Sequence, residues 1–280
     1  MAELWGATDA GRVLRMPTAA DDKYSRGVLG MRTGSTRYPG AAVLGVEAAW
    51  RTGIGLVRYL GPPAPTDLVL NRRPETVTVD GRVQAWVIGS GTDPQDRADA
   101  ETAALRGILS GAVPVVVDAG ALDLAVGATA PRILTPHDRE HDRLRAALGL
   151  RAVGASREDA AVETARALGA TVLLKGSVTI VADADGWIAH VASGTPWLAT
   201  AGTGDVLAGA IGAVLAGAAA GAGGPVHLGR VAATGAWLHG RAATLCTQAA
   251  VGGAGTGPIT ALDAAGYLPR AVAEVLRASP

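Results

Sequence analysis

The sequence has no net charge, almost no cysteine and no export signal. Its 25 acidic and 25 basic side chains cancel, which argues against a protein that binds nucleic acid or an anionic membrane surface by bulk electrostatics. Cys246 is the single cysteine, so an internal disulfide is excluded. Because the N-terminal stretch has no basic start followed by an apolar core and a cleavage site, we expect a cytoplasmic protein.

Two further features are missing. The five histidines and the single cysteine show no closely spaced ligand set, so we expect no metal site built from protein ligands. No Pro/Ser-rich linker or block of like charges divides the 280 residues, and a chain of this length can form one large α/β domain. We therefore expect a single domain over residues 1–280 that acts on small molecules.

What is present is an alternation of short β-type runs with Ala-rich helical stretches, which predicts a mostly parallel sheet covered by helices on both faces. Three of the runs end in polar or glycine-rich residues: 83–88 before Gly89-Ser90-Gly91, 113–117 before Asp118, and 132–134 before Thr135-Pro136-His137. Ligands of open α/β sheets bind beyond the carboxyl ends of the strands, so we expect these junctions to meet in one cleft. Taken singly, each junction is better interpreted as a turn or a helix cap.

The later strands indicate a mixed sheet. Residues 171–176, 178–182 and 187–189 have strand character, and the last two runs are joined by a turn at 183–186, which predicts an antiparallel portion. Lys175 ends the first of these runs beside Gly176, where its ammonium could reach a phosphate. An ordinary surface lysine is the alternative.

Asp205 is the only charged residue between Asp185 and Arg230, and it follows the glycine-rich stretch 199–204. The apolar run 206–215 has helical spacing, so we expect a buried helix to begin just after the glycines, with Asp205 at its head. A glycine-opened helix start is a site for an anion such as phosphate. A simple N-cap is the alternative for Asp205. A membrane span is disfavoured because the run is mostly Ala and Gly and abuts an acidic residue.

A glycine-opened helix is also expected near the N-terminal end, over residues 40–52, followed by a glycine-rich turn into a strand at 56–57. Ala41 and Ala42 at its start leave room for a ligand, although tight helix-on-sheet packing explains small side chains equally well.

Together these segments resemble the ADP-dependent NAD(P)H-hydrate dehydratases of the ribokinase-like superfamily. The resemblance is carried, in chain order, by residues 23–27, 40–57, 89–91, 117–122, 135–140, 174–179 and 199–209. Gly-Thr-Gly-Asp alone fits many sugar and vitamin kinases, whereas Thr-Pro-His with a Glu three residues later and Leu-Lys-Gly-x-x-Thr narrow it to the dehydratases. The resemblance implies a three-layer α/β/α sandwich.

The resemblance also implies site residues. Asp205 would be the catalytic group at the hydrated nicotinamide, and the substrate would be bound by Ala41, Gly91, His137 and Asp205. The nucleotide would be bound by Lys175, Gly176, Ser177, Val178, Thr179, Gly202, Thr203 and Gly204. Mg²⁺ would accompany ADP, held largely by phosphates and water. The chain departs from the family at Thr92-Asp93 and at Asp138-Arg139, and the second change is expected to weaken the turn after His137.

Two expectations concern individual side chains. A lone histidine is more often a hydrogen-bonded structural residue than a ligand contact, but Pro136 fixes an extended exit that would present His137 over the sheet edge. A carboxylate at a helix N-terminus is expected to be held ionised, which suits Asp205 as proton acceptor.

Two other functions stay open. A kinase of the same fold, acting on a vitamin precursor or a sugar, would stop at the phosphorylated product. A nucleotide-binding regulator without turnover would need the anion site but not Asp205. For the dehydratase we expect a homo-oligomer, with a homotetramer as one form, no epimerase domain within the chain, and a functional link to a separate NAD(P)H-hydrate epimerase.

Overall fold

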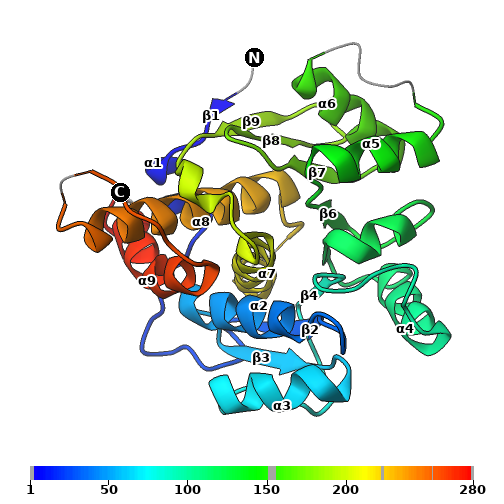
Figure 1. Ribbon diagram of the computed structural model, residues 1–280, viewed down its shortest axis with the longest axis horizontal. Coiled ribbons are helices and arrows are strands. Elements are labelled where there is room, and N and C mark those ends of the chain that lie inside the picture. Colours follow the sequence, from blue (N-terminus) through cyan, green and yellow to red (C-terminus); the bar gives the residue numbers. More distant parts are fainter. Residues whose placement is uncertain (1–2, 151–155, 222–223, 254, 279–280) are drawn as a thin grey trace.

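Runs of β-branched and aliphatic residues form one sheet of nine strands in the computed structural model, which describes residues 3–150, 156–221, 224–253 and 255–278 (Figure 1). The strand order is β1-β9-β8-β7-β6-β5-β4-β2-β3. The bounds are β1 Glu3–Leu4, β2 Val28–Arg32, β3 Leu56–Tyr59, β4 Ala85–Ile88, β5 Val115–Val117, β6 Arg132–Leu134, β7 Thr171–Leu174, β8 Thr179–Ala182 and β9 Ile188–Val191.

The sheet is parallel from β3 to β7. Strand β8 runs antiparallel to both β7 and β9, and β1 pairs parallel with β9. The predicted mostly parallel sheet with a late antiparallel portion is therefore confirmed. In register, Ile88 lies opposite Val117 and Val117 opposite Leu134, so β4, β5 and β6 end level with one another.

Helices cover both faces of the sheet. Their bounds are α1 Ala7–Gly11, α2 Pro39–Thr52, α3 Pro63–Arg72, α4 Asp99–Leu109, α5 Asp138–Ala147, α6 Arg157–Leu168, α7 Thr203–Gly221, α8 Leu228–Ala250 and α9 Ala261–Ala278. Short 3₁₀ turns occupy Ala119–Leu124 and Pro196–Leu198. In Figure 1, α7 is seen end-on at the centre, with α2, α8 and α9 around it.

Alternate strand residues supply two separate cores, as the two-residue period of a strand requires. Val87, Val116 and Ile133 join α2, α7, α8 and α9 in one core. Their neighbours Ile88 and Val117 join α4, α5 and α6 in the other. The result is the expected three-layer α/β/α sandwich.

Helix α7 is long and apolar enough to cross a membrane by length and composition alone. Its residues from Val206 to Ala216 are, however, all buried, between the sheet and other helices. The small residues permit this packing: Gly209 lies against the backbone of Gly45 on α2, and Gly212 lies against Val87 of the sheet. The expectation of a core helix is confirmed.

The start of α7 differs from the sequence prediction. The helix begins at Thr203 rather than after the glycines, so Asp205 is its third residue and not its cap. Gly202, with a φ of +87°, precedes the helix. The glycine that makes the bend is therefore Gly202, whereas Gly204 lies inside the first turn.

Candidate active site

Four polar side chains meet at the carboxyl ends of β4 to β7, with Asp118 at their centre. Asp118 Oδ2 accepts a hydrogen bond of 2.9 Å from Ser90 Oγ. Asp118 Oδ1 accepts one of 2.7 Å from Thr135 Oγ1 and one of 3.1 Å from Lys175 Nζ. The predicted convergence of the strand junctions in one place is confirmed. Asp118 is 2% exposed, so its charge is held in the protein interior.

Lys175 connects this cluster to the start of α7. Its Nζ lies 3.1 Å from Asp118 Oδ1 and 3.6 Å from Glu140 Oε2. Burial by itself lowers the pKa of Lys175, but the two carboxylates outweigh it and the pKa is raised. A methyl group built on Gly204 would lie 3.7 Å from the same Nζ. The Lys175 ammonium therefore faces the first turn of α7.

Asp205 lies in that first turn, and its pKa is raised to about 7. Burial is the main cause, the charge of Asp118 adds to it, and Lys175 opposes it. The expectation that the helix start holds this carboxylate ionised is therefore wrong. The partial positive charge at a helix start stabilises a carboxylate by about 1 kcal/mol. The free-energy cost of removing that carboxylate from water and placing it near a second carboxylate is larger.

The first turn of α7 also offers backbone donors. The first N–H groups of any helix lack intrahelical acceptors, and among the described residues we find no acceptor for the N–H groups of Thr203, Gly204 or Asp205. The Thr203 hydroxyl donates to Leu198 O at 2.9 Å and so holds the preceding turn in place. These donors, with Lys175 nearby, form an electropositive position that suits a phosphate.

Ala41 and Gly91 lie against each other at the same edge of the sheet. Ala41 is in the first turn of α2, and Gly91 follows Ser90 with a φ of +67°. A side chain on Gly91 would collide with Ala41 and with Tyr38 O, 2.9 Å away. Both small residues are therefore required by close packing as well as by any ligand beside them.

His137 caps α5. Its Nδ1 accepts from the backbone N–H groups of Arg139 and Glu140 at 3.1 and 3.3 Å, while Glu140 Oε2 accepts from His137 N at 2.8 Å. This is a reciprocal capping box. The expected weakening of the turn is wrong, because Asp138 and Arg139 are the first helical residues. The His137 side chain is half-exposed, and its Nε2 lies 3.6 Å from Glu140 Oε2.

The loop from Lys175 to Thr179 is held by Arg157, a residue that sequence reasoning missed. Arg157 donates to Lys175 O at 2.8 Å and to Val178 O at 3.2 Å, and its Nε donates to Asp138 Oδ1 at 2.9 Å. Gly176 is small because a methyl group there would lie 2.7 Å from Arg157 Nη2. No sequence pattern announced this contact, which joins α6 to the loop.

Three other residues of the site were also missed. Asp118 was noted only as a junction, and the spacing of Glu140 from His137 was a capping-box signal that could have placed it. His239 on α8 had no signal at all. It is buried, and no hydrogen-bond partner for its Nε2 is found among the described residues. Burial, with Lys175 adding, lowers the pKa of His239 to about 4, although the Thr203 backbone opposes this, so the ring is neutral.

The candidate site offers few free protein oxygens to a metal ion. Within the described ranges no group of three or more His, Cys, Asp or Glu side chains is arranged to hold a metal. Both oxygens of Asp118 already accept hydrogen bonds from protein groups. Phosphate oxygens and water would thus supply most ligands, as is usual for Mg²⁺.

The α/β architecture, a mostly parallel sheet with antiparallel strands at one end, matches that of ribokinase-like structures. A ribokinase-like superfamily protein from Enterococcus faecalis superposes with a TM-score of 0.79 at 21% identity, covering 98% of this chain and 96% of that one.

The chain belongs to the NAD(P)H-hydrate dehydratase family, whose model matches residues 29–263. An ADP/ATP-dependent NAD(P)H-hydrate dehydratase from Bacillus subtilis, co-crystallised with ATP and Mg²⁺, superposes with a TM-score of 0.81 at 25% identity, covering 98% of this chain and 99% of that one.

Two curated relatives support the family. An ADP-dependent (S)-NAD(P)H-hydrate dehydratase from Neisseria meningitidis is 37% identical over 248 residues, which are 81% of this chain and 80% of that protein. A bifunctional NAD(P)H-hydrate repair enzyme, Nnr, from Mycobacterium tuberculosis is 45% identical over 222 residues, 75% of this chain and 45% of that protein. The chain thus spans about half the length of its bifunctional relatives.

Proposed function

We propose that the protein dehydrates the (S)-hydrate of NADH or NADPH back to the reduced cofactor, using ADP and releasing AMP and phosphate. The observation that carries the proposal is the position of Asp205. Its carboxyl group lies in the first turn of α7, close enough to Lys175 and Asp118 for both charges to shift its pKa. A group that titrates near neutral pH at an anion-binding helix start is suited to accept a proton during phosphoryl transfer.

The first chemical step improves the leaving group. The substrate hydroxyl would leave poorly as hydroxide, so its oxygen attacks the terminal phosphorus of ADP. A P–O bond to the substrate forms as the P–O bond to AMP breaks, and the hydroxyl proton passes to Asp205. A loose phosphoryl-transfer transition state asks little basicity of the acceptor, so a pKa of about 7 is sufficient.

Elimination follows. The lone pair of the ring nitrogen expels phosphate as the C–O bond breaks, and loss of a proton from the neighbouring carbon restores the dihydronicotinamide double bond. The N–H groups of the first turn of α7 and the Lys175 ammonium stabilise negative charge on the transferring phosphoryl group, which is the main contribution in such reactions. Mg²⁺, when bound with ADP, neutralises phosphate charge in the same region.

The residues implied by the family fit these roles. The nucleotide would lie over the loop from Lys175 to Thr179 and the residues 202–204. The hydrated ring would lie between Asp205, the Nε2 edge of His137, and the contact of Ala41 with Gly91. Arg157 and Asp118 would act through others, Arg157 by fixing the loop and Asp118 by holding the Lys175 ammonium.

An absorbance assay of regenerated NADH tests this function. Purified protein is incubated with NADH hydrate and Mg²⁺, with ADP and ATP supplied in turn, and AMP, phosphate and NADH are measured. We expect one AMP and one phosphate per NADH with ADP. A phosphorylated substrate that accumulates without NADH would show a kinase that stops at the first step, and no turnover of the hydrate would refute the proposal.

The setting of the enzyme is proposed on the family resemblance. We propose a cytoplasmic homo-oligomer, with a homotetramer as the form to test by sedimentation. Because the proposed reaction uses one epimer of the hydrate, an epimerase activity would supply the (S) form from the (R) form. Adding a purified epimerase to a mixture of the two epimers should raise the final yield of NADH.

A further inference from the structure

A cavity lies at the opposite ends of the strands from the candidate active site. We name it the distal cavity; it has a volume of about 480 Å³ and is lined by residues from the N-terminal segment 12–26, the end of α2, the last turns of α7, the start of α8 and α9. Arg26 precedes β2 and Gly53 precedes β3, which places the cavity at the amino ends of the parallel strands. Ala218 lies thirteen residues beyond Asp205, or about 20 Å along α7.

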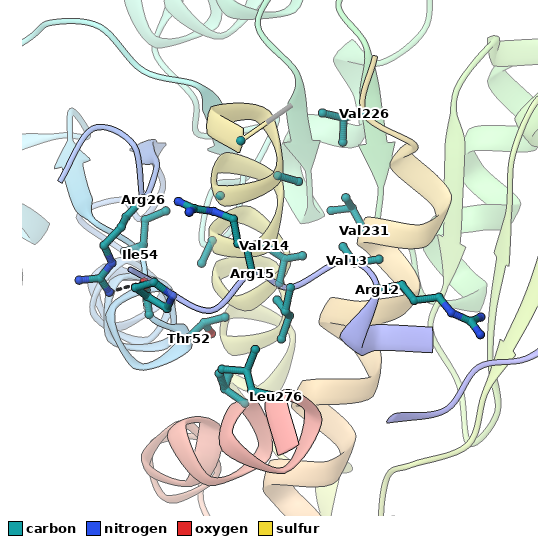
Figure 2. A pocket seen from close by; sticks show the side chains of 18 of the residues that line it. Arg12, Val13, Arg15, Arg26, Thr52, Ile54, Val214, Val226, Val231 and Leu276 are labelled. Carbon is teal, nitrogen blue, oxygen red and sulfur yellow. Dashed lines mark hydrogen bonds between the residues drawn. The ribbon is translucent and has the colours of Figure 1, made fainter. Parts of the chain in front are cut away.

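The lining combines apolar walls with guanidinium groups. Figure 2 shows Arg15 and Arg26 on one side of the cavity, with Val13 and Val231 on the other. Arg12 and Arg230 complete a set of four arginines, and no acidic residue lines the cavity among the described residues. Pockets of about 300–1,000 Å³ with apolar walls and a few polar groups are typical of small-molecule sites.

Among the described residues, no carboxylate pairs with two of the four guanidinium groups. Arg12 is paired with Asp9, and Arg15 with Asp21. Arg26 donates to Gly53 O at 2.7 Å, and its buried Nε has no partner within the described part of the chain.

Arg230 likewise has no ion pair there; it is exposed beside the cavity. Helix ends add about half a charge each: negative at the ends of α7 and α9, and positive at the start of α8. The charges of the Arg26 and Arg230 guanidinium groups exceed the net partial charge of these helix ends, so the cavity is electropositive.

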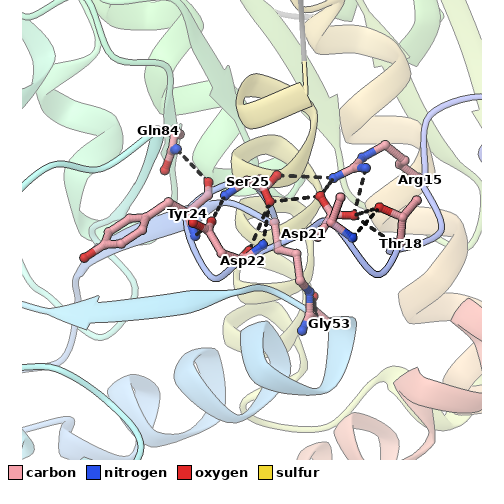
Figure 3. A network of polar contacts seen from close by, with 10 residues as sticks. Arg15, Thr18, Asp21, Asp22, Tyr24, Ser25, Gly53 and Gln84 are labelled. Carbon is pink, nitrogen blue, oxygen red and sulfur yellow. Dashed lines mark hydrogen bonds and ion pairs between the residues drawn. The ribbon is translucent and has the colours of Figure 1, made fainter.

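A network of hydrogen bonds holds the segment that carries Arg15 and Arg26 (Figure 3). Asp21 accepts from Arg15 at 2.6 Å, from Thr18 N at 2.7 Å and from Ser25 Oγ at 2.9 Å. Asp22 Oδ1 accepts from the backbone N–H groups of Tyr24 and Ser25, each at 2.8 Å. This network fixes the motif 23–27.

A tie to the sheet completes the arrangement. Gln84 Nε2 donates to Tyr24 O at 3.1 Å, and Gln84 Oε1 accepts from Val28 N at 2.7 Å. The backbone on either side of Arg26 is therefore tied to Gln84, and the Arg26 guanidinium is held by Gly53 O. Such preorganisation lowers the entropy cost of binding.

We propose that the distal cavity binds an amphipathic small-molecule anion, namely a phosphate or carboxylate head group attached to an apolar body. The head group would pair with Arg26 and Arg230, and the apolar body would lie against Val13, Val214 and Leu276. This site is separate from the proposed nucleotide site, so the anion and the nucleotide can occupy the protein at the same time.

Calorimetric titration with n-octyl phosphate, with and without saturating ADP and Mg²⁺, tests the proposal. We expect n-octyl phosphate to bind more tightly than either n-octanol or inorganic phosphate, and to bind in the presence of ADP. Equal binding of the three probes, or loss of n-octyl phosphate binding when ADP is present, would overturn the proposal.

Two variants remove the site by different means. Arg230→Glu reverses the charge of a residue that would pair with the head group, and Ala218→Leu fills the cavity without changing charge. Each should weaken binding about tenfold or more. Arg106→Glu, an exposed charge reversal on α4, should bind as the wild type does. Thermal unfolding checks each fold, and either folded variant suffices to decide. Wild-type affinity in the variants, or a changed oligomeric state in Ala218→Leu in place of a changed affinity, would refute the site.

Discussion

Lys175 Nζ lies 3.1 Å from Asp118 Oδ1, and this ion pair joins the ends of β5 and β7 to the start of α7. The pair has two consequences for Asp205. The ammonium favours its ionised form, while the buried Asp118 carboxylate disfavours it. Burial and these two opposing charges therefore place the pKa of the proposed proton acceptor at about 7.

Asp205→Asn should abolish turnover and keep nucleotide binding. The amide keeps the size of the side chain but cannot accept the hydroxyl proton, and general-base contributions are about 10² to 10⁴. We expect kcat to fall by about a hundredfold or more, measured by NADH regeneration. ADP affinity, measured by calorimetry, should persist because the substitution leaves Lys175 and the backbone N–H groups of the first turn of α7 in place. Retained turnover in a folded Asp205→Asn variant would make Asp205 a structural residue.

The raised pKa of Asp205 predicts the pH dependence of both rate and stability. The carboxylate is the active form, so kcat should rise with pH through about 7. For stability, the folded state holds this proton more tightly than the unfolded state. The contribution is therefore present below the unfolded pKa and is lost as pH rises through about 7.

Urea unfolding of wild type and Asp205→Asn at pH 5 and pH 8 measures that loss. We expect the free energy of unfolding of the variant, relative to that of the wild type, to be higher at pH 8 than at pH 5. The difference should be on the order of 2 kcal/mol once solvent screening is allowed for. Parallel stability profiles for the two proteins would contradict the raised pKa.

Lys175→Met should separate nucleotide binding from the stability of the buried cluster. Loss of the ammonium should raise the KM for ADP more than it lowers kcat. It also leaves Asp118 with an uncompensated charge, at a cost of about 3 kcal/mol or less, because Lys175 is partly exposed. The double variant Lys175→Met/Asp118→Asn should regain stability but not ADP affinity. An unchanged KM for ADP in Lys175→Met would remove Lys175 from the nucleotide site.

His137 has a capping role and a proposed substrate role, and two substitutions distinguish them. His137→Asn keeps an acceptor for the first turn of α5, whereas His137→Ala removes it and should cost about 1 kcal/mol in unfolding free energy. Both variants lose Nε2, so both should raise the KM for the hydrate with ADP affinity unchanged. Wild-type kinetics in His137→Asn would show that His137 caps α5 but does not bind the substrate.

Gly209→Ala tests the packing that places the start of α7. A methyl group there would meet the backbone of Gly45 on α2, and overpacking of this kind costs about 1–3 kcal/mol. Gly107→Ala on α4 is the matched control, since nothing lies within 4 Å of its added methyl group. It should gain up to about 1 kcal/mol from helix propensity. Equal stability of the two variants would show that α7 and α2 are not in close contact.

The sequence by itself determined the alternation of strands and helices, the antiparallel turn at 183–186, and the core helix over 206–215. It also indicated that the junctions after β4, β5 and β6 meet. Each of these follows from local periodicity or from the rule that parallel strands end at one edge. The roles of Asp205, Lys175 and His137 came from the family resemblance and stay predictions.

Tertiary structure alone decided the electrostatics and the supporting contacts. Burial raises the pKa of Asp205 to about 7, and Asp118, which is distant in sequence, adds to the shift. Arg157 reaches the loop of Lys175 from another helix. Burial and long-range charge depend on which segments pack together, and no local pattern encodes that. For the same reason the distal cavity, formed where the N-terminal segment meets α7, α8 and α9, could be found only in the folded chain.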